Sequence, residues 1–109
     1  MNTEFINRVE LQGIIGSARR YRVGEQEGFQ LTIATNRTYE DADGTPVIET
    51  QWTVCCGWIS DRVNPSLIEK GRKVHLMGRL RTQRYTTAAG EDRYTHEVIV
   101  DSLSETNKQ

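Results

Sequence analysis

The chain has 109 residues, 36% of them hydrophobic and 27% charged, a length that fits one small globular domain and excludes a large multi-domain enzyme. No apolar run approaches the roughly 18 residues needed to span a bilayer, so we expect a soluble, cytoplasmic protein without membrane contact. The net charge of −1 argues neither for nor against a polyanionic partner.

Alternation of apolar and polar residues predicts β-strands along most of the chain. The segments with this period of two, which we expect to form five strands, are residues 7–17, 29–35, 49–58, 73–81 and 94–103. Residues 36–46 are polar around Asp43-Gly44 and predict a hairpin loop between the second and third strands. In residues 60–69 a helix start signal is followed by Pro65, which limits the segment to one short helix or two irregular turns.

Five strands in so short a chain would leave long exposed edges if they formed a flat sheet. Gly13 and Gly78 lie inside predicted strands, where glycine often marks a bend. Bending lets the sheet close, and the helical segment after the third strand favours a barrel over a sandwich. We therefore predict an all-β fold, a five-stranded Greek-key OB-fold barrel with a short helix between strands three and four. The barrel domain would cover residues 1–103, and residues 104–109 would form a short, frayed, polar C-terminal end.

The residue pattern indicates neither a metal site nor a catalytic site. Cys55 and Cys56 are adjacent, without the two-residue gap of a zinc knuckle, and strand neighbours point to opposite faces. His75 and His96 lie on separate predicted strands, and no glycine-rich phosphate loop is present. We therefore expect no metal, no cofactor and no enzymatic activity. Two unpaired cysteines fit a reducing compartment.

Two tryptophans share one face of the third predicted strand. Trp52 and Trp58 have the same parity, so both indoles point to the same side. Parity does not determine whether that side is the interior, and two core tryptophans are the ordinary interpretation. Phe5 and Phe29 also fall at strand positions that suit a core, whereas Tyr39 lies in the predicted hairpin loop and needs another explanation.

The fourth predicted strand is strongly basic. Between Lys70 and Arg84 there are six basic residues and no acidic one, and Tyr85 follows directly. An unpaired nucleic acid strand offers base faces that stack on flat rings and phosphates that attract cations, whereas duplex DNA exposes no base faces. Aromatic rings interleaved with arginines therefore favour a single-stranded nucleic acid partner over the simpler interpretation of a solvated basic face.

Several short segments occur in a specific order and spacing. They are FQLTIATN at 29–36, Lys70-Gly71, MGRLRT at 77–82, GEDRY at 90–94 and Glu97-Val98. This series resembles the bacterial single-stranded DNA-binding protein family over about residues 5–103. The resemblance implies an OB-fold protein that binds and protects single-stranded DNA without sequence preference during DNA replication, recombination or repair, does no covalent chemistry, and usually forms a homotetramer.

The resemblance also implies a set of site residues. Its DNA-stacking aromatic residues would be Tyr39, Trp52, Trp58 and Tyr85. Its phosphate-binding residues would be drawn from Arg8, Arg37, Arg72, Lys73, Arg79, Arg81 and Arg84. In this arrangement both tryptophans point outward, while Thr53, Cys55 and Gly57 point inward, which is the opposite of the core interpretation.

This sequence departs from the family pattern at two places. Thr53 stands where the family usually has a histidine, so a dimer is the alternative to the favoured tetramer. The family usually has a tail that recruits replication enzymes, whereas this chain stops at Gln109, so we do not expect recruitment by that route.

Two other functions remain as alternatives. One alternative is an OB-fold module similar to primosomal replication protein N, which mainly docks replication proteins. The other is a nuclease whose acidic loop, with Asp41 and Asp43, binds a metal.

Overall fold

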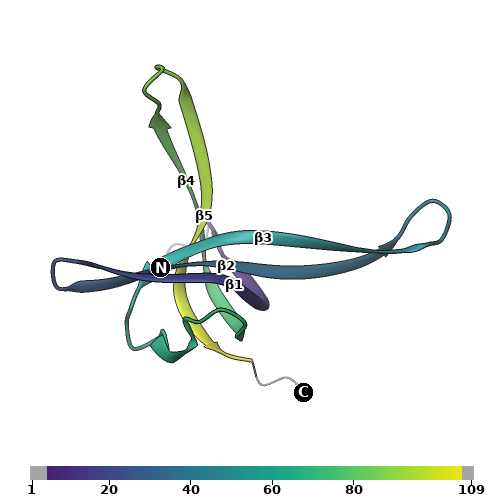
Figure 1. Cartoon of the computed structure of the whole chain (residues 1–109), viewed down its shortest axis with the longest axis horizontal. Helices are drawn as coiled ribbons and strands as arrows, with labels where there is room; N and C mark the ends of the chain where they lie inside the picture. Colours follow the sequence, from purple (N-terminus) through teal and green to yellow (C-terminus); the bar gives the residue numbers. More distant parts are fainter. Residues whose placement is uncertain (1–4, 107–109) are drawn as a thin grey trace.

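The computed structural model describes residues 5–106, and Figure 1 shows strands curled into a barrel from which long hairpins project. The strands follow one another around the closed barrel in the order β1-β2-β3-β5-β4. Their bounds are β1 Val9–Val23, β2 Gln26–Glu40, β3 Pro46–Trp58, β4 Lys73–Thr86 and β5 Asp92–Glu105. The predicted five-stranded barrel is confirmed, and the helix between strands three and four is a single 3-10 turn, η1 Pro65–Leu67.

Alternate residues of each strand point into the barrel and form its core. On β2 the period of two places Phe29, Leu31 and Ile33 inside, where none of them keeps exposed surface. The other core side chains come from the remaining strands and from the segment around η1, and they are Ile15, Cys55, Val63, Leu67, Ile68, Val74, Leu76, Val98, Val100 and Leu103. The prediction of a buried Phe5 is wrong: this residue precedes β1, and 80% of its surface is exposed.

Strand β1 connects two parts of the barrel because it changes partner along its length. Its first part pairs with β4 and its second part with β2, with a bulge between Ile15 and Ser17. Gly13 lies where the two partners meet, and a Cβ atom there would be 2.2 Å from the Ala34 carbonyl oxygen. Opposite this crossing, the barrel is closed by parallel pairing of β3 with β5, in the register Cys55↔Val98 and Cys56↔Ile99.

The hairpins are longer than the sequence predicts. The loop predicted at 36–46 is wrong for all but residues 41–45, because β2 and β3 stay paired as far as Glu40 and Pro46. Polar cross-strand contacts hold this ribbon, including the Arg37–Glu49 ion pair at 2.9 Å. Its outer half is exposed on both faces, so it lacks the apolar alternation by which strands are recognised.

Three hairpins, β1–β2, β2–β3 and β4–β5, extend from the barrel in different directions (Figure 1). Each tip has a glycine with positive φ, a conformation that other residues rarely adopt: Gly24, Gly44 and Gly90. At the C-terminal end, residues 104 and 105 complete β5 and are not frayed, whereas residues 107–109 lie outside the described part. Among residues 5–106, no helix is long and apolar enough to cross a membrane.

Candidate nucleic-acid interface

The candidate interface is the outward side of the β1-β2-β3 sheet, which we call the outer face. On β3 it carries Trp52, Val54, Cys56 and Trp58, because Cys55 between them points into the core. Trp52 is 57% exposed and Trp58 is 43% exposed. The core interpretation of the tryptophans is therefore wrong, and their outward direction matches what the resemblance implies.

Small residues on the neighbouring strands give the Trp52 indole its place. Trp52 lies opposite Ala34 in the β2–β3 register. Its ring extends over β1, where a Cβ atom on Gly16 would be 2.3 Å from the indole Cζ3 atom. Thr32 lies beside the same spot on β2. The indole thus lies across the sheet with more than half of its surface open to solvent.

Trp58 has an aromatic neighbour that the sequence analysis missed. The Tyr21 ring lies over Gly28, and its centroid is 6.3 Å from that of Trp58, with the ring planes tilted by 58°. The Arg19 guanidinium stands 5.4 Å from the Tyr21 centroid, within the range of a cation–π contact. The apolar alternation predicts that the first strand ends near Ser17, whereas β1 continues to Val23. The equal spacing of Ser17, Arg19 and Tyr21 is the signal that places all three on one face.

A cavity of about 220 Å³ lies beside Trp58, and we call it the Trp58 cavity. It is bounded by strands from both sides of the β3–β5 junction. Its lining includes Tyr21, Cys56, Trp58, Arg79, Arg81 and Ile99. The structure therefore brings two of the predicted phosphate-binding arginines to the same cavity as a predicted stacking residue. An aromatic wall opposite two cations is the arrangement that a nucleotide, with one flat base and one charged phosphate, can fill.

Carboxylates hold both arginines of the Trp58 cavity. Arg79 Nη1 lies 3.0 Å from Asp101 Oδ1. Arg81 donates through Nε, at 3.0 Å, and through Nη2 to the same Glu97 carboxylate oxygen. The hydrogen bond to Glu97 raises the pKa of Arg81, so this guanidinium stays charged. The pKa of the Cys56 thiol is also raised, first by burial and then by the charge of Glu97, so the thiol stays neutral near pH 7.

Tyr85 continues the outer face along the β4–β5 hairpin, beyond the barrel. It has the same parity on β4 as Arg79 and Arg81, lies opposite Arg93 on β5, and is 50% exposed. Arg84 has the other parity, opposite Tyr94, and its Nη1 lies 3.9 Å from an Asp92 oxygen. Alternation thus places Tyr85 on the side of the Trp58 cavity and Arg84 on the opposite side.

Tyr39 lies on β2 and not in a loop, in the long β2–β3 hairpin. It is 40% exposed, and the Arg37 guanidinium lies 5.0 Å from its ring centroid. Tyr39 lies on the same side of β2 as Ile33, which faces inward. Ala34, the cross-strand partner of Trp52, lies on the other side of β2. Tyr39 and Arg37 therefore form a separate pair on the alternate face of the ribbon.

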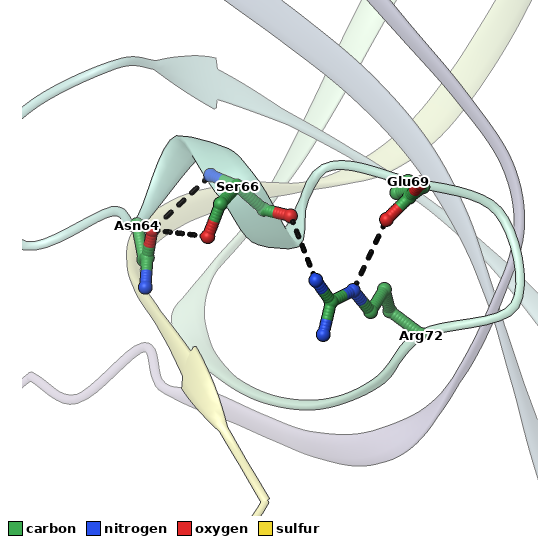
Figure 2. Close-up of polar contacts among 4 residues, drawn as sticks. All are labelled: Asn64, Ser66, Glu69 and Arg72. Atoms are coloured by element: carbon green, nitrogen blue, oxygen red, sulfur yellow. Dashed lines mark hydrogen bonds and ion pairs between the residues drawn. The ribbon is translucent and has the colours of Figure 1, made fainter.

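The remaining predicted cations lie elsewhere. Figure 2 shows Arg72 in the loop after η1, where its Nε donates to Glu69 at 3.2 Å and its Nη2 to the Ser66 carbonyl at 3.5 Å. The Asn64 side chain in turn accepts hydrogen bonds from the backbone and hydroxyl of Ser66. Lys73 begins β4 opposite Ile14, and Arg8 is exposed just before β1. Among the described residues, no group of three or more His, Cys, Asp or Glu side chains is placed to hold a metal ion.

Two solved structures with the same fold are those of single-stranded DNA-binding proteins. The structure described as Plasmodium falciparum SSB in complex with ssDNA has a TM-score of 0.82 and 22% sequence identity, covering 98% of this chain and 100% of that one. A small single-stranded DNA-binding protein from Streptomyces coelicolor has a TM-score of 0.70 and 11% identity, covering 94% and 97%. Residues 6–105 match the single-strand binding protein family, a span that includes all five strands. The chain belongs to the single-strand binding protein family.

Proposed function

We propose that this protein binds single-stranded DNA without sequence preference, through base stacking and phosphate neutralisation. The observation that carries the proposal is the Trp58 cavity, where an exposed indole and two arginines meet on the outer face. Family membership and the fold shared with an SSB solved with ssDNA support it. The function needs binding alone and includes no covalent step.

Stacking supplies affinity that does not depend on base identity. Each base–aromatic stack contributes about 1 to 3 kcal/mol, and every base has a face that can stack. Trp52 rests against Gly16 and Trp58 against Tyr21, so both rings are already positioned before DNA arrives. We propose Trp52 and Trp58 as the central stacking residues, with Tyr85 extending the path along the β4–β5 hairpin and Tyr39 as a separate stacking residue on the alternate face of the β2–β3 hairpin.

Phosphate contacts supply the part of the affinity that depends on salt. We propose Arg79 and Arg81 as the first phosphate ligands, because they line the Trp58 cavity. Arg37 stands beside Tyr39 and can serve the same role on the β2–β3 hairpin. The wider predicted set also contains Arg8, Arg72, Lys73 and Arg84. The logarithm of the binding constant should fall with the logarithm of salt concentration by about 0.7 for each phosphate neutralised.

Fluorescence and affinity measurements with oligo-dT test this function. Binding should change the tryptophan emission, and Trp58→Ala should weaken binding by roughly 5- to 150-fold, the equivalent of one lost stack. Tyr85→Ala should weaken it in the same direction. Tyr94→Ala is the matched control, because Tyr94 is 60% exposed and lies on the alternate face of the same hairpin.

Two results would contradict the proposed function. One is unchanged emission and no complex with oligo-dT at low salt. The other is full DNA binding by a folded Trp52→Ala, Trp58→Ala double variant, which would favour a protein-docking module instead. Circular dichroism of each variant establishes that it is folded.

We also propose that the chain acts as a homo-oligomer, with a tetramer favoured over a dimer, in DNA replication, recombination or repair in the cytoplasm. Exposed apolar side chains outside the Trp58 cavity support self-association, since Phe5 is 80%, Ile6 83% and Leu80 49% exposed. The mass in solution, measured with and without oligo-dT, should be a multiple of 12.5 kDa for the protein component. A monomer at all concentrations would contradict the assembly but leave DNA binding intact.

A further inference from the structure

The two arginines of the Trp58 cavity are held by carboxylates of unlike character. Glu97 has only 13% of its side chain exposed and receives two guanidinium nitrogens of Arg81. Asp101 is 50% exposed and makes one contact, at 3.0 Å, with an Arg79 side chain that is 54% exposed. The Arg79–Asp101 pair is therefore the more weakly held of the two, since half-exposed single-contact pairs contribute little to stability.

The position of Asp101 makes it a rival of any phosphate at Arg79. Arg79 lines the Trp58 cavity and lies opposite Ile99 on β5. Asp101 lies two residues after Ile99 on the same strand. A phosphate beside a base stacked on Trp58 would approach the same guanidinium. Carboxylate and phosphate oxygens accept the same charge-assisted hydrogen bonds from arginine. In the free protein Asp101 already accepts one of them.

We propose that Asp101 is a built-in competitor of the DNA backbone, which holds Arg79 in the free protein and yields it to a phosphate when single-stranded DNA binds. This inference rests on the proposed function, because it needs DNA at the Trp58 cavity. Its effect is to lower affinity and keep binding reversible. Glu97 stays on Arg81 throughout, since its carboxylate is nearly buried.

The exchange predicts an unusual salt dependence. A phosphate that binds an unpaired arginine releases a condensed cation into solution, and this release makes binding weaker at high salt. When the arginine comes from Asp101, the freed carboxylate attracts a cation in return. The net release at Arg79 is then reduced, although the contact itself forms. Removing the carboxylate charge should restore the full release.

Anisotropy of a dye-labelled oligo-dT, measured over a series of sodium chloride concentrations, tests the inference with Asp101→Asn. This variant keeps the side-chain shape and should bind about two- to fivefold more tightly at low salt. Its salt slope should become steeper by up to about 0.7. Glu27→Gln is the matched control, because it removes one charge from the Arg20–Glu27 pair on the β1–β2 hairpin, whose arginine is outside the proposed phosphate-binding set. The control should show less than half of the affinity gain.

The double variant Arg79→Ala, Asp101→Asn separates competition from a general charge effect. If Asp101 acts through Arg79, the double variant should bind like Arg79→Ala. A similar gain from Asp101→Asn with and without Arg79 would overturn the inference, as would unchanged or weaker binding by the folded single variant. Wild-type protein that does not bind the oligonucleotide would overturn the proposed function as well, whereas wild-type binding with no Asp101 effect overturns this inference alone.

Discussion

At the scale of single residues, two glycines make room for the rings of the proposed stacking surface. Gly16 leaves the space in which the Trp52 indole lies, and Gly28 leaves the space under the Tyr21 ring. Neither has a positive φ, so the absence of a side chain matters here and not an unusual backbone conformation. Each ring therefore lies close to the backbone of a neighbouring strand, which limits its freedom before any ligand binds.

Gly16→Ala tests this role of glycine. The added Cβ atom would lie 2.3 Å from the Trp52 ring, so the indole must swing away from the sheet. We expect red-shifted tryptophan emission and about fivefold weaker oligo-dT binding, near the lower limit for one stack. Ser102→Ala, which adds no volume and lies on β5 opposite Met77, is the control. Unchanged emission and affinity in the glycine variant would show that Trp52 does not depend on this space.

The two tryptophans also show what alternation along a strand can and cannot predict about the site. Parity places Trp52 and Trp58 on one face, but it does not distinguish inside from outside. The deciding fact concerns the residues of β3 that alternate with the tryptophans. Cys55 and Gly57 are small enough for the narrow interior at the junction with β5, whereas large rings are not. A Cβ atom on Gly57 would already lie 3.1 Å from the Val100 carbonyl oxygen. This crowding depends on barrel closure and cannot be predicted from β3 alone.

At the scale of elements, the sequence predicts strands well wherever one face is buried. All five strands and their order with respect to η1 follow from apolar alternation. The errors lie in the hairpin arms: the pattern ends β1 near Ser17 and β2 before Asn36, whereas the strands continue to Val23 and Glu40. In these arms both faces meet solvent, so cross-strand polar pairs replace apolar contacts.

The same cause explains which site residues the sequence misplaces. Tyr21 and Tyr39 both lie in arms, so one is missed and the other is assigned to a loop. Tyr85 also lies in an arm, but the basic strand before it marks its position. Arg79 and Arg81 are identified as cations, whereas their carboxylate partners are not, because Asp101 and Glu97 are some 16 to 22 residues away along the chain. Long-range pairing of this kind requires the β4–β5 register.

At the scale of the whole molecule, one buried thiol connects folding to alkaline pH. Burial is the first cause, and the neighbouring Cys56 the second, that raise the pKa of Cys55 from 9.0 to about 12. The thiol in the unfolded chain therefore ionises at lower pH than the thiol in the barrel. Above about pH 9 the unfolded state binds fewer protons than the folded state, so stability falls as pH rises toward 12.

Chemical denaturation at several pH values tests this linkage. The free energy of unfolding should fall between about pH 9 and pH 12, and the fall should be smaller in Cys55→Ala, which has no thiol to ionise in the core. Comparison of the two slopes removes the contribution of tyrosines and lysines, which both proteins share. Equal slopes would show that the Cys55 thiol does not resist ionisation in the fold.

The junction of β3 with β5 holds together the two sides of the Trp58 cavity. Two residue pairs join these strands, whereas the β2–β3 and β4–β5 hairpins are zipped along their whole lengths. The barrel is thus closed at this junction by a short stretch of parallel pairing, with a long hairpin on each side. Trp58 lies on β3 of one hairpin, and Arg79 and Arg81 lie on β4 of the other, so the spacing between the indole ring and the two guanidinium groups depends on the β3–β5 junction. In the proposed function, the pairing of β3 with β5 therefore sets the width that the Trp58 cavity offers to a nucleotide.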